Sequence, residues 1–168
     1  MESSKTIITL KTSDEELFEV EKSVAMEMVT VKNFFDEDDD DSSSMSKLTI
    51  IPVPAVSSES LSMIITYIDK HLQLKAIGAD EGAKKAYDAR FMEQASKHGL
   101  LLELILAANY LDVQYLLDKL NDAVAKLIEN KSVEFVRDFF GIQNDFTSEE
   151  EAKIRQDHIW AFKDVDKD

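Results

Sequence analysis

The sequence predicts a mixed α/β fold in which strands and helices share the first 75 residues and helices alone follow. Apolar residues alternate with polar ones near the N-terminus, then recur at helical spacing, and keep the helical period through the C-terminal half. A chain of 168 residues is long enough for one sizeable core, so we expect one domain with a peripheral extension. Its few glycines and prolines argue against disorder throughout the chain.

The N-terminal alternation predicts a β-hairpin. Ile8 and Leu10 alternate with polar neighbours, and Phe18 and Val20 do the same after the polar stretch Thr12 to Glu16. Two alternating runs joined by a polar turn are typical of antiparallel strands.

A helix should follow the hairpin and lead into an acidic loop. Val24, Met28, Val31 and Phe35 form one apolar stripe of an amphipathic helix. Residues 36–47 are rich in Asp and Ser, and like charges at this density predict a solvated surface loop.

A calcium-binding loop is the alternative for this acidic stretch, and the spacing excludes it. An EF-hand loop that starts at Asp36 needs Gly in place of Asp41 and Glu in place of Lys47.

The next elements are a strand, a long helix and a linker. Leu48 to Val53 is a short β-branched strand, and the prolines at 52 and 54 do not suit the interior of a central strand. Ser57 is the expected N-cap of a helix that extends to Leu72. Residues 75–86 have little periodicity and contain two glycines, which predicts a linker or an insertion.

Four helices should make up the rest of the chain. The first, Leu100 to Leu111, is almost wholly apolar, so we expect it to be buried on most sides. Val113 to Ile128 is the second, and the third begins after Ser132 and ends at Gly141. The last opens at Thr147 with a capping box completed by the Glu three residues later.

Composition excludes several classes of partner and chemistry. A net charge of −15 disfavours nucleic acid and anionic membrane surfaces as partners. The absence of Cys removes disulfides, thiolate nucleophiles and Cys-based zinc sites. No apolar run reaches the roughly 20 residues of a membrane span, and no signal peptide is visible, so we expect an intracellular protein.

No catalytic, cofactor or metal site is predicted. His71, His98 and His158 are far apart in the sequence and have no zinc-type spacing. No nucleophile with a base, catalytic carboxylate pair or Gly-rich phosphate loop is recognisable, so we expect a protein that is not an enzyme.

A surplus of large apolar side chains near the C-terminus allows two interpretations. They dock onto the preceding helices and complete the core, which the cost of exposed aromatic surface favours, or they await a partner. The residues are Phe139, Phe140, Ile142, Phe146, Ile154, Ile159, Trp160 and Phe162.

Three strings resemble the Skp-type adaptor family of the Skp, cullin and F-box ubiquitin ligases, with plant members nearest. They are the N-terminal KTIITLKTSDEELFEVE, LELILAANYLDVQYLLD from Leu102 to Asp118, and VAKLIENKSVEFVRDFFGIQNDFTSEEEAKIRQDHIWAF from Val124 to Phe162. The resemblance implies a BTB/POZ-like domain over residues 1–128 and a helical F-box-binding extension over residues 129–168.

The resemblance also implies an adaptor without chemistry of its own, which joins a cullin scaffold to F-box proteins in the nucleus and cytoplasm. A divergent paralogue that stabilises F-box proteins outside a ligase is the alternative. Asn109 and Tyr110 match the family's cullin-contacting positions. The positions matching its F-box side are Val124, Ala125, Ile128, Phe140, Ile142, Asn144, Asp145, Phe146 and Trp160.

Overall fold

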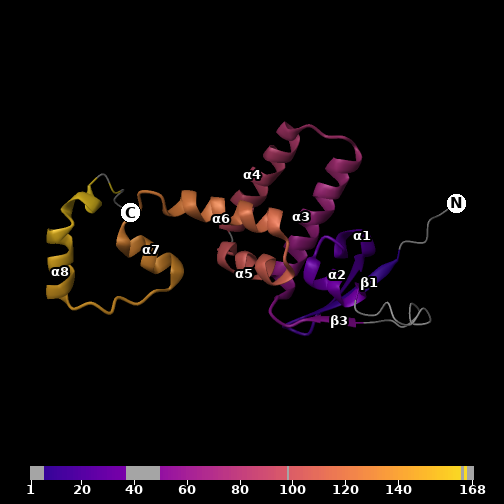
Figure 1. Cartoon of the computed structure of the whole chain (residues 1–168), viewed down its shortest axis with the longest axis horizontal. Coiled ribbons are helices and arrows are strands. Elements are labelled where there is room, and N and C mark those ends of the chain that lie inside the picture. Colours follow the sequence, from indigo (N-terminus) through magenta and orange to yellow (C-terminus); the bar gives the residue numbers. More distant parts are fainter. Residues whose placement is uncertain (1–5, 37–49, 98, 164, 166–168) are drawn as a thin grey trace. The chain divides into compact units, whose positions relative to one another are not determined.

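The computed structural model describes residues 6–36, 50–97, 99–163 and 165, and it has the predicted mixture of strands and helices (Figure 1). The elements follow in the order β1 (Ile7–Thr12), β2 (Leu17–Glu21), α1 (Lys22–Ala25), α2 (Val29–Asp36), β3 (Ile50–Val53), α3 (Ser58–Ala76), α4 (Glu81–Lys97), α5 (Leu101–Leu111), α6 (Gln114–Ile128), α7 (Val133–Phe140), α8 (Ser148–Asp157) and the 3₁₀ helix η1 (Ile159–Phe162). All of the predicted acidic loop except its first residue lies outside the described residues.

The chain forms two compact units, the N-terminal unit of residues 1–121 and the C-terminal unit of residues 122–168. The sequence predicts the boundary after residue 128 instead. The difference arises because α6 is one continuous helix, and its last turns belong to the C-terminal unit.

A three-stranded sheet in the order β2-β1-β3 opens the N-terminal unit. The predicted hairpin is confirmed, because β1 pairs antiparallel with β2, with Leu10 opposite Phe18. β3 pairs parallel with β1 and forms an edge, where Pro52, which has no N–H to donate, is tolerated. One face of the sheet is buried through alternate residues such as Ile8, Leu10 and Ile51.

The helix predicted from Val24 to Phe35 is divided into two short ones, α1 and α2. Its apolar stripe is correct, since Val24, Met28 and Val31 are all buried. The predicted continuity of the helix is wrong. The N–H groups of Glu27 and Met28 bond to carbonyls three residues back, which tightens the backbone into a turn between α1 and α2.

Two side chains hold the first residues of α3 in place through hydrogen bonds. The Ser57 side chain accepts the N–H of Ser60, as the N-cap prediction requires. Asp14, in the turn of the hairpin, accepts hydrogen bonds from the N–H and the hydroxyl of Ser58. The Ser58 hydroxyl is the largest cause that lowers the pKa of Asp14 to about 2.

The prediction of a linker over residues 75–86 is wrong. α3 extends to Ala76 and α4 starts at Glu81, so the two helices lie side by side and are joined by a short turn (Figure 1). Gly78 takes the positive φ of 64° in this turn, and Asp80 accepts the N–H of Ala83 at the start of α4. Periodicity misses the helix because its first turns are exposed, so no apolar stripe marks them.

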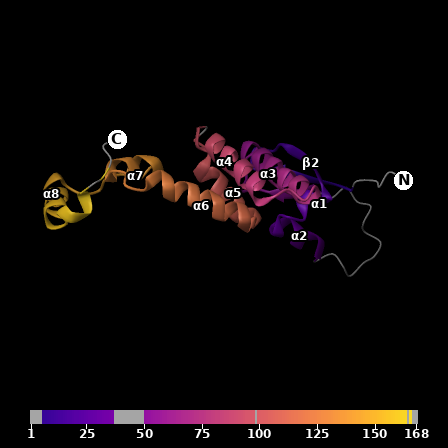
Figure 2. The same ribbon diagram turned by 90° about the horizontal axis from the view of Figure 1, so that it is seen from above.

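A buried carboxylate joins α4 to α3. Asp88 is buried, and its Oδ1 accepts the Tyr67 hydroxyl at 2.8 Å and lies 2.8 Å from the Nε2 of His71. Burial, and then the hydrogen bond to Asp88, raise the pKa of Tyr67. Figure 2 shows α3, α4 and α5 packed together.

The prediction that α5 is buried on most sides is wrong on one face. Leu104, Ala108 and Leu111 are buried, but the Leu106 side chain is 68% exposed. The buried residues recur at helical spacing, which leaves Leu106 on the face that also carries Glu103 and Asn109.

In the C-terminal unit, α7 begins and ends where the sequence predicts, and α8 begins there. Ser132 caps α7 by accepting the N–H of Phe135, and Gly141 ends it in the left-handed conformation. Thr147 and Glu150 form the capping box of α8. Apolar spacing extends the predicted last helix to Trp160, but α8 ends at Asp157 and Trp160 lies in η1.

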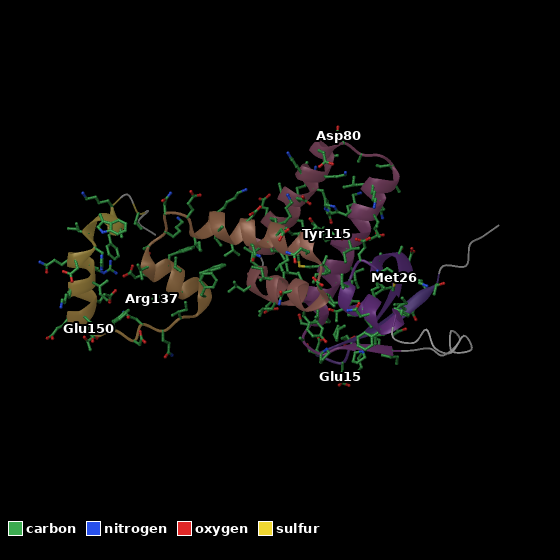
Figure 3. All side chains as sticks on the ribbon, in the orientation of Figure 1. Glu15, Met26, Asp80, Tyr115, Arg137 and Glu150 are labelled. Atoms are coloured by element: carbon green, nitrogen blue, oxygen red, sulfur yellow. The ribbon has the colours of Figure 1, made fainter. Side chains whose placement is uncertain are left out.

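A polar network holds α7 and α8 in this unit, and Figure 3 labels Arg137 on α7 and Glu150 at the start of α8. Glu151 Oε1 lies 3.0 Å from Arg155 Nη2 and 3.4 Å from Arg137 Nη1, while its Oε2 accepts the Asn144 amide at 2.9 Å. The hydrogen bond from Arg155 is the largest cause that lowers the pKa of Glu151, and the backbone of Thr147 has the same effect on Glu150.

We predict that the Tyr67 hydroxyl stabilises the N-terminal unit through Asp88. Tyr67→Phe removes one donor from a buried carboxylate, which costs about 1 to 3 kcal/mol of unfolding free energy, measured by urea denaturation. Tyr115→Phe is the matched control, because the Tyr115 hydroxyl has no hydrogen-bond partner among the described residues, and it should change stability by less than about 0.5 kcal/mol. Equal losses in both variants would contradict the role of Asp88.

The C-terminal unit should loosen at low pH before the sheet does. The lowered pKa values of Glu150 and Glu151 mean that their stabilisation is complete above the ordinary value of 4.5 and is lost as the pH falls through the folded-state values. Trp160, the single tryptophan, should report this as a drop in fluorescence anisotropy below about pH 4.5.

The double variant Glu150→Gln, Glu151→Gln should have low anisotropy at every pH. Glu149→Gln is the control, since Glu149 has no hydrogen-bond or ion-pair partner within the described part of the chain. A pH profile of the double variant that matches the wild type would show that other groups cause the loosening.

Candidate protein-interaction surfaces

Asn109 and Tyr110, the predicted cullin contacts, lie at the C-terminal end of α5. The Asn109 side chain is exposed and that of Tyr110 is half-buried. The Thr30 hydroxyl of α2 donates to the Tyr110 carbonyl at 2.6 Å, which fixes this end of α5 against α2. The two residues therefore lie on the surface of the N-terminal unit, beside α2.

Two exposed apolar side chains border this pair and are missed by the sequence reasoning. Leu106 lies one turn before Asn109 on α5, and Phe34, which is also exposed, lies one turn after Thr30 on α2. We call Phe34, Leu106, Asn109 and Tyr110 the α2–α5 surface. A helical wheel of α5 identifies Leu106, because it places this residue on the same face as Glu103 and Asn109.

The α2–α5 surface suits a protein partner better than a small ligand. An exposed leucine and phenylalanine beside an amide and a phenol combine apolar contact area with a polar rim. No pocket is needed for such contacts, and the affinity comes from the area that a partner covers.

The second predicted set of residues lies in the C-terminal unit. Val124 is buried, Ala125 is exposed and Ile128 is half-buried, all on the last turns of α6. None of the side chains of α7, α8 and η1 is buried. The interpretation that the C-terminal aromatics form a core is therefore wrong within this unit.

The exposed members of this set are mainly large and apolar. Trp160 is 72% exposed, and the others are exposed to smaller degrees. We call these residues the C-terminal apolar set: Phe140, Ile142, Phe146, Ile159 and Trp160. Ile159 belongs to the apolar surplus seen in the sequence, but the sequence reasoning did not assign it to the F-box side.

Two polar residues predicted for the F-box side lie between members of this set. Asn144 Oδ1 accepts the N–H of Phe146 at 3.1 Å, so its amide shapes the segment between α7 and α8. Asp145 is exposed. The role of each predicted residue in binding stays a prediction.

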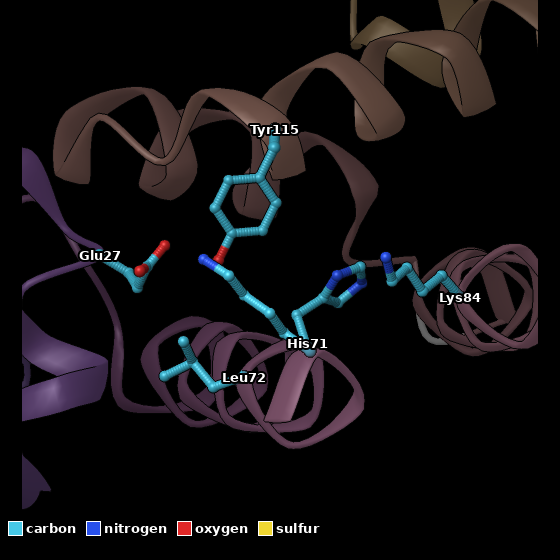
Figure 4. Close-up of a pocket in the computed structure, with 6 residues that line it drawn as sticks. Glu27, His71, Leu72, Lys84 and Tyr115 are labelled. Carbon is cyan, nitrogen blue, oxygen red and sulfur yellow. The ribbon is translucent and has the colours of Figure 1, made fainter. Parts of the chain in front are cut away.

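A pocket of about 260 Å³ that is lined by both polar and apolar residues lies in the N-terminal unit. Figure 4 shows Tyr115, His71 and Lys84 converging on it from three helices, with Glu27 on another side. Groups of three or more His, Cys, Asp or Glu side chains that suit a metal ion do not occur among the residues the structure describes. Within the same residues, no helix has both the length and the apolar character to cross a membrane.

Comparison with known families accounts for both parts of the chain. Residues 6–73 match the model described as "Skp1 family, tetramerisation domain", and residues 114–161 match "Skp1 family, dimerisation domain". Together with the small sheet and its helices, the first match confirms the predicted BTB/POZ-like fold.

The chain is also similar over nearly its whole length to plant proteins. SKP1-like protein 1A of Arabidopsis thaliana is 42% identical over 166 residues, which cover 93% of this chain and 97% of that protein. SKP1-like protein 1 of Oryza sativa subsp. japonica is 40% identical, with 96% and 98% covered, and SKP1-like protein 14 of Arabidopsis thaliana is 36% identical, with 95% and 99% covered. This chain, too, belongs to the Skp1 family of adaptor proteins.

Proposed function

We propose that this chain is the adaptor subunit of a cullin-RING ubiquitin ligase of the Skp, cullin and F-box type. It bridges a cullin scaffold, bound at the α2–α5 surface, and F-box substrate receptors, bound at the C-terminal apolar set. The adaptor is not an enzyme in this proposal, and it brings a substrate to the machinery that transfers ubiquitin.

The observation that carries the proposal is the presence of two exposed, partly aromatic sets in two different units of one chain. Leu106 and Phe34 flank Asn109 and Tyr110 in the first unit, whereas the set around Trp160 lies in the second. Exposed apolar residues in such numbers are typical of surfaces that partners cover. Two such surfaces on one chain raise the effective concentration of one partner near the other.

The proposed compartments are the nucleus and the cytoplasm. A chain without cysteine is compatible with the reducing interior of a cell, where disulfides are not available for stability. Imaging of the fluorescently tagged chain tests this part of the proposal, and accumulation in secretory compartments would contradict it.

Reconstitution tests the adaptor function directly. The chain is co-expressed with the N-terminal domain of a cullin and with the F-box segment of an F-box protein, and the complex is sized by light scattering. A ternary complex of one copy each is expected. Binding of the F-box segment alone would favour a paralogue that acts outside a ligase.

We predict that Asn109→Lys with Tyr110→Lys abolishes cullin binding and leaves F-box binding intact. Two charges at a desolvated contact usually cost several kcal/mol, so cullin affinity should fall by at least about a hundredfold. The two sets of residues belong to different units and share no member, so F-box affinity should change by less than about threefold. Both affinities are measured by calorimetry beside the unfolding temperature.

Ile77→Lys is the control for this variant. Ile77 is also strongly exposed in the N-terminal unit, but it lies at the end of α3, away from the α2–α5 surface. Cullin binding should survive this change. Equal losses for both partners in the double variant, with unchanged stability, would contradict the two-site proposal.

Trp160→Ala should weaken F-box binding by at least about thirtyfold. Truncation of a large aromatic contact typically costs about 2 kcal/mol or more of binding free energy. Because the Trp160 side chain is exposed in the free chain, thermal unfolding should stay within a degree or two of the wild type, about the effect of a surface change.

Lys163→Ala, a nearby exposed change, serves as the control for Trp160. A loss of folding stability comparable to that of a core substitution would show that Trp160 acts in packing rather than in binding.

A further inference from the structure

The Glu151 carboxylate is the point where three parts of the C-terminal unit meet. It contacts Arg137 of α7, Asn144 of the segment between the helices, and Arg155 one turn further along α8. Both carboxylate oxygens are used, because Oε1 faces the two guanidinium groups and Oε2 accepts the amide. We call these four residues the Glu151 network.

Two side chains of the Glu151 network are half-buried between α7 and α8, and Arg155 and Asn144 lie at its exposed edge. The side chains of Glu151 and Arg137 are 24% and 19% exposed, whereas Phe146 is 47% exposed as a residue. The ion pairs between α7 and α8 therefore contribute to the spacing of the two helices.

Members of the Glu151 network also hold the backbone of two residues of the C-terminal apolar set. The Arg137 carbonyl accepts the N–H of Ile142 at 2.8 Å, and Asn144 Oδ1 accepts the N–H of Phe146 at 3.1 Å. Both the Arg137 and the Asn144 side chain bond to the Glu151 carboxylate. The carboxylate therefore restrains the backbone of the segment that carries Ile142 and Phe146.

Arg155 extends the network to the beginning of α7 and to η1. Its guanidinium also pairs with Glu134 on α7 and lies 5.0 Å from the centre of the Phe162 ring. A cation over a ring face is attracted by the ring's quadrupole, so this contact restrains the short helix that carries Trp160.

We propose that Glu151 is the positioning residue of the F-box site: it touches no partner, and it preorganises Ile142, Phe146 and Trp160 by holding α7, α8 and the segment between them on one carboxylate. This inference rests on the proposed function, because it assigns a role in binding to a residue inside the site. A preorganised surface loses less conformational entropy on binding than a flexible one, so its affinity is higher without any added contact.

Glu151→Gln is the variant that tests the inference. The amide keeps the size of the side chain but loses the charge, so it cannot hold two guanidinium groups. Affinity for a purified F-box segment that binds the wild-type chain should fall by about tenfold, the combined effect of a few exposed ion pairs. Calorimetry should show a larger entropic cost of binding in the variant.

Two controls separate positioning from a general loss of structure. Glu149→Gln removes a charge from the same turn of α8, and it should leave the affinity within about twofold. The double variant Glu151→Gln, Arg137→Gln should bind no more weakly than Glu151→Gln alone, because both changes break the same contact. Glu151→Gln and Trp160→Ala should be less than additive, because Glu151 acts partly through Trp160.

The salt dependence of the affinity distinguishes an electrostatic role of Glu151 from a role in packing. Between about 0.1 M and about 1 M salt the Debye length falls from about 10 Å to about 3 Å, so the advantage of the wild type over Glu151→Gln should shrink toward none. The affinity ratio of the two proteins is the quantity to follow, since it cancels the effect of salt on direct contacts with the F-box segment.

The outcomes distinguish this inference from the proposed function. A wild-type chain that binds no F-box segment removes the proposed function itself. Wild-type binding with equal affinities for Glu151→Gln and Glu149→Gln would overturn the positioning role alone. A tenfold loss that is independent of salt would also overturn it, because Glu151 would then act through packing. A loss that is additive with that of Arg137→Gln would overturn it too, because Glu151 would then act outside the network.

Discussion

The packing of α5 against α2, α3 and α4 is the interaction on which the N-terminal unit depends. Its buried face, which includes Leu104 and Leu111, lies against α4, which directly precedes it, and against α2 and α3, which are far from it in the sequence. The same packing turns Asn109 outward and brings the Tyr110 carbonyl to the Thr30 hydroxyl. Core and candidate cullin surface are thus two faces of one helix, and burial of one decides the exposure of the other.

The opposite arrangement governs the C-terminal unit. Its helices are too short and too few to enclose the large side chains they carry, so the apolar groups stay outside and ion pairs lie between the helices. Each exposed ion pair contributes little to stability by itself. Glu151 is different because one carboxylate serves three partners, which gives a geometry that separate pairs would not specify.

These two arrangements suit the two tasks of an adaptor. A surface built on a packed helix is present before the partner arrives, so its affinity depends mainly on contact area and shape. A unit held by polar contacts keeps apolar groups accessible, and in the proposed function the F-box partner that covers them supplies the missing core. The acidic character of the whole chain keeps such a molecule soluble while these groups are exposed.

The sequence by itself determined the local features and the family. Alternation, capping residues and the left-handed glycine at 141 are decided by neighbours in the chain, so the hairpin, the starts of α3 and α8 and both ends of α7 were predictable. The strings around Asn109 and Phe146 were distinctive enough to indicate the family, which the comparisons confirm.

Only the tertiary structure decided the rest, because burial depends on residues distant in the sequence. The first turns of α4 carry no apolar stripe, so its helical state escaped the pattern until its place beside α3 was known. Leu106 looked like a core residue until the helices packed on α5 left its face open. Glu151 was one acidic residue among 34, and it became distinctive only when folding brought Arg137 and Asn144 to the same carboxylate.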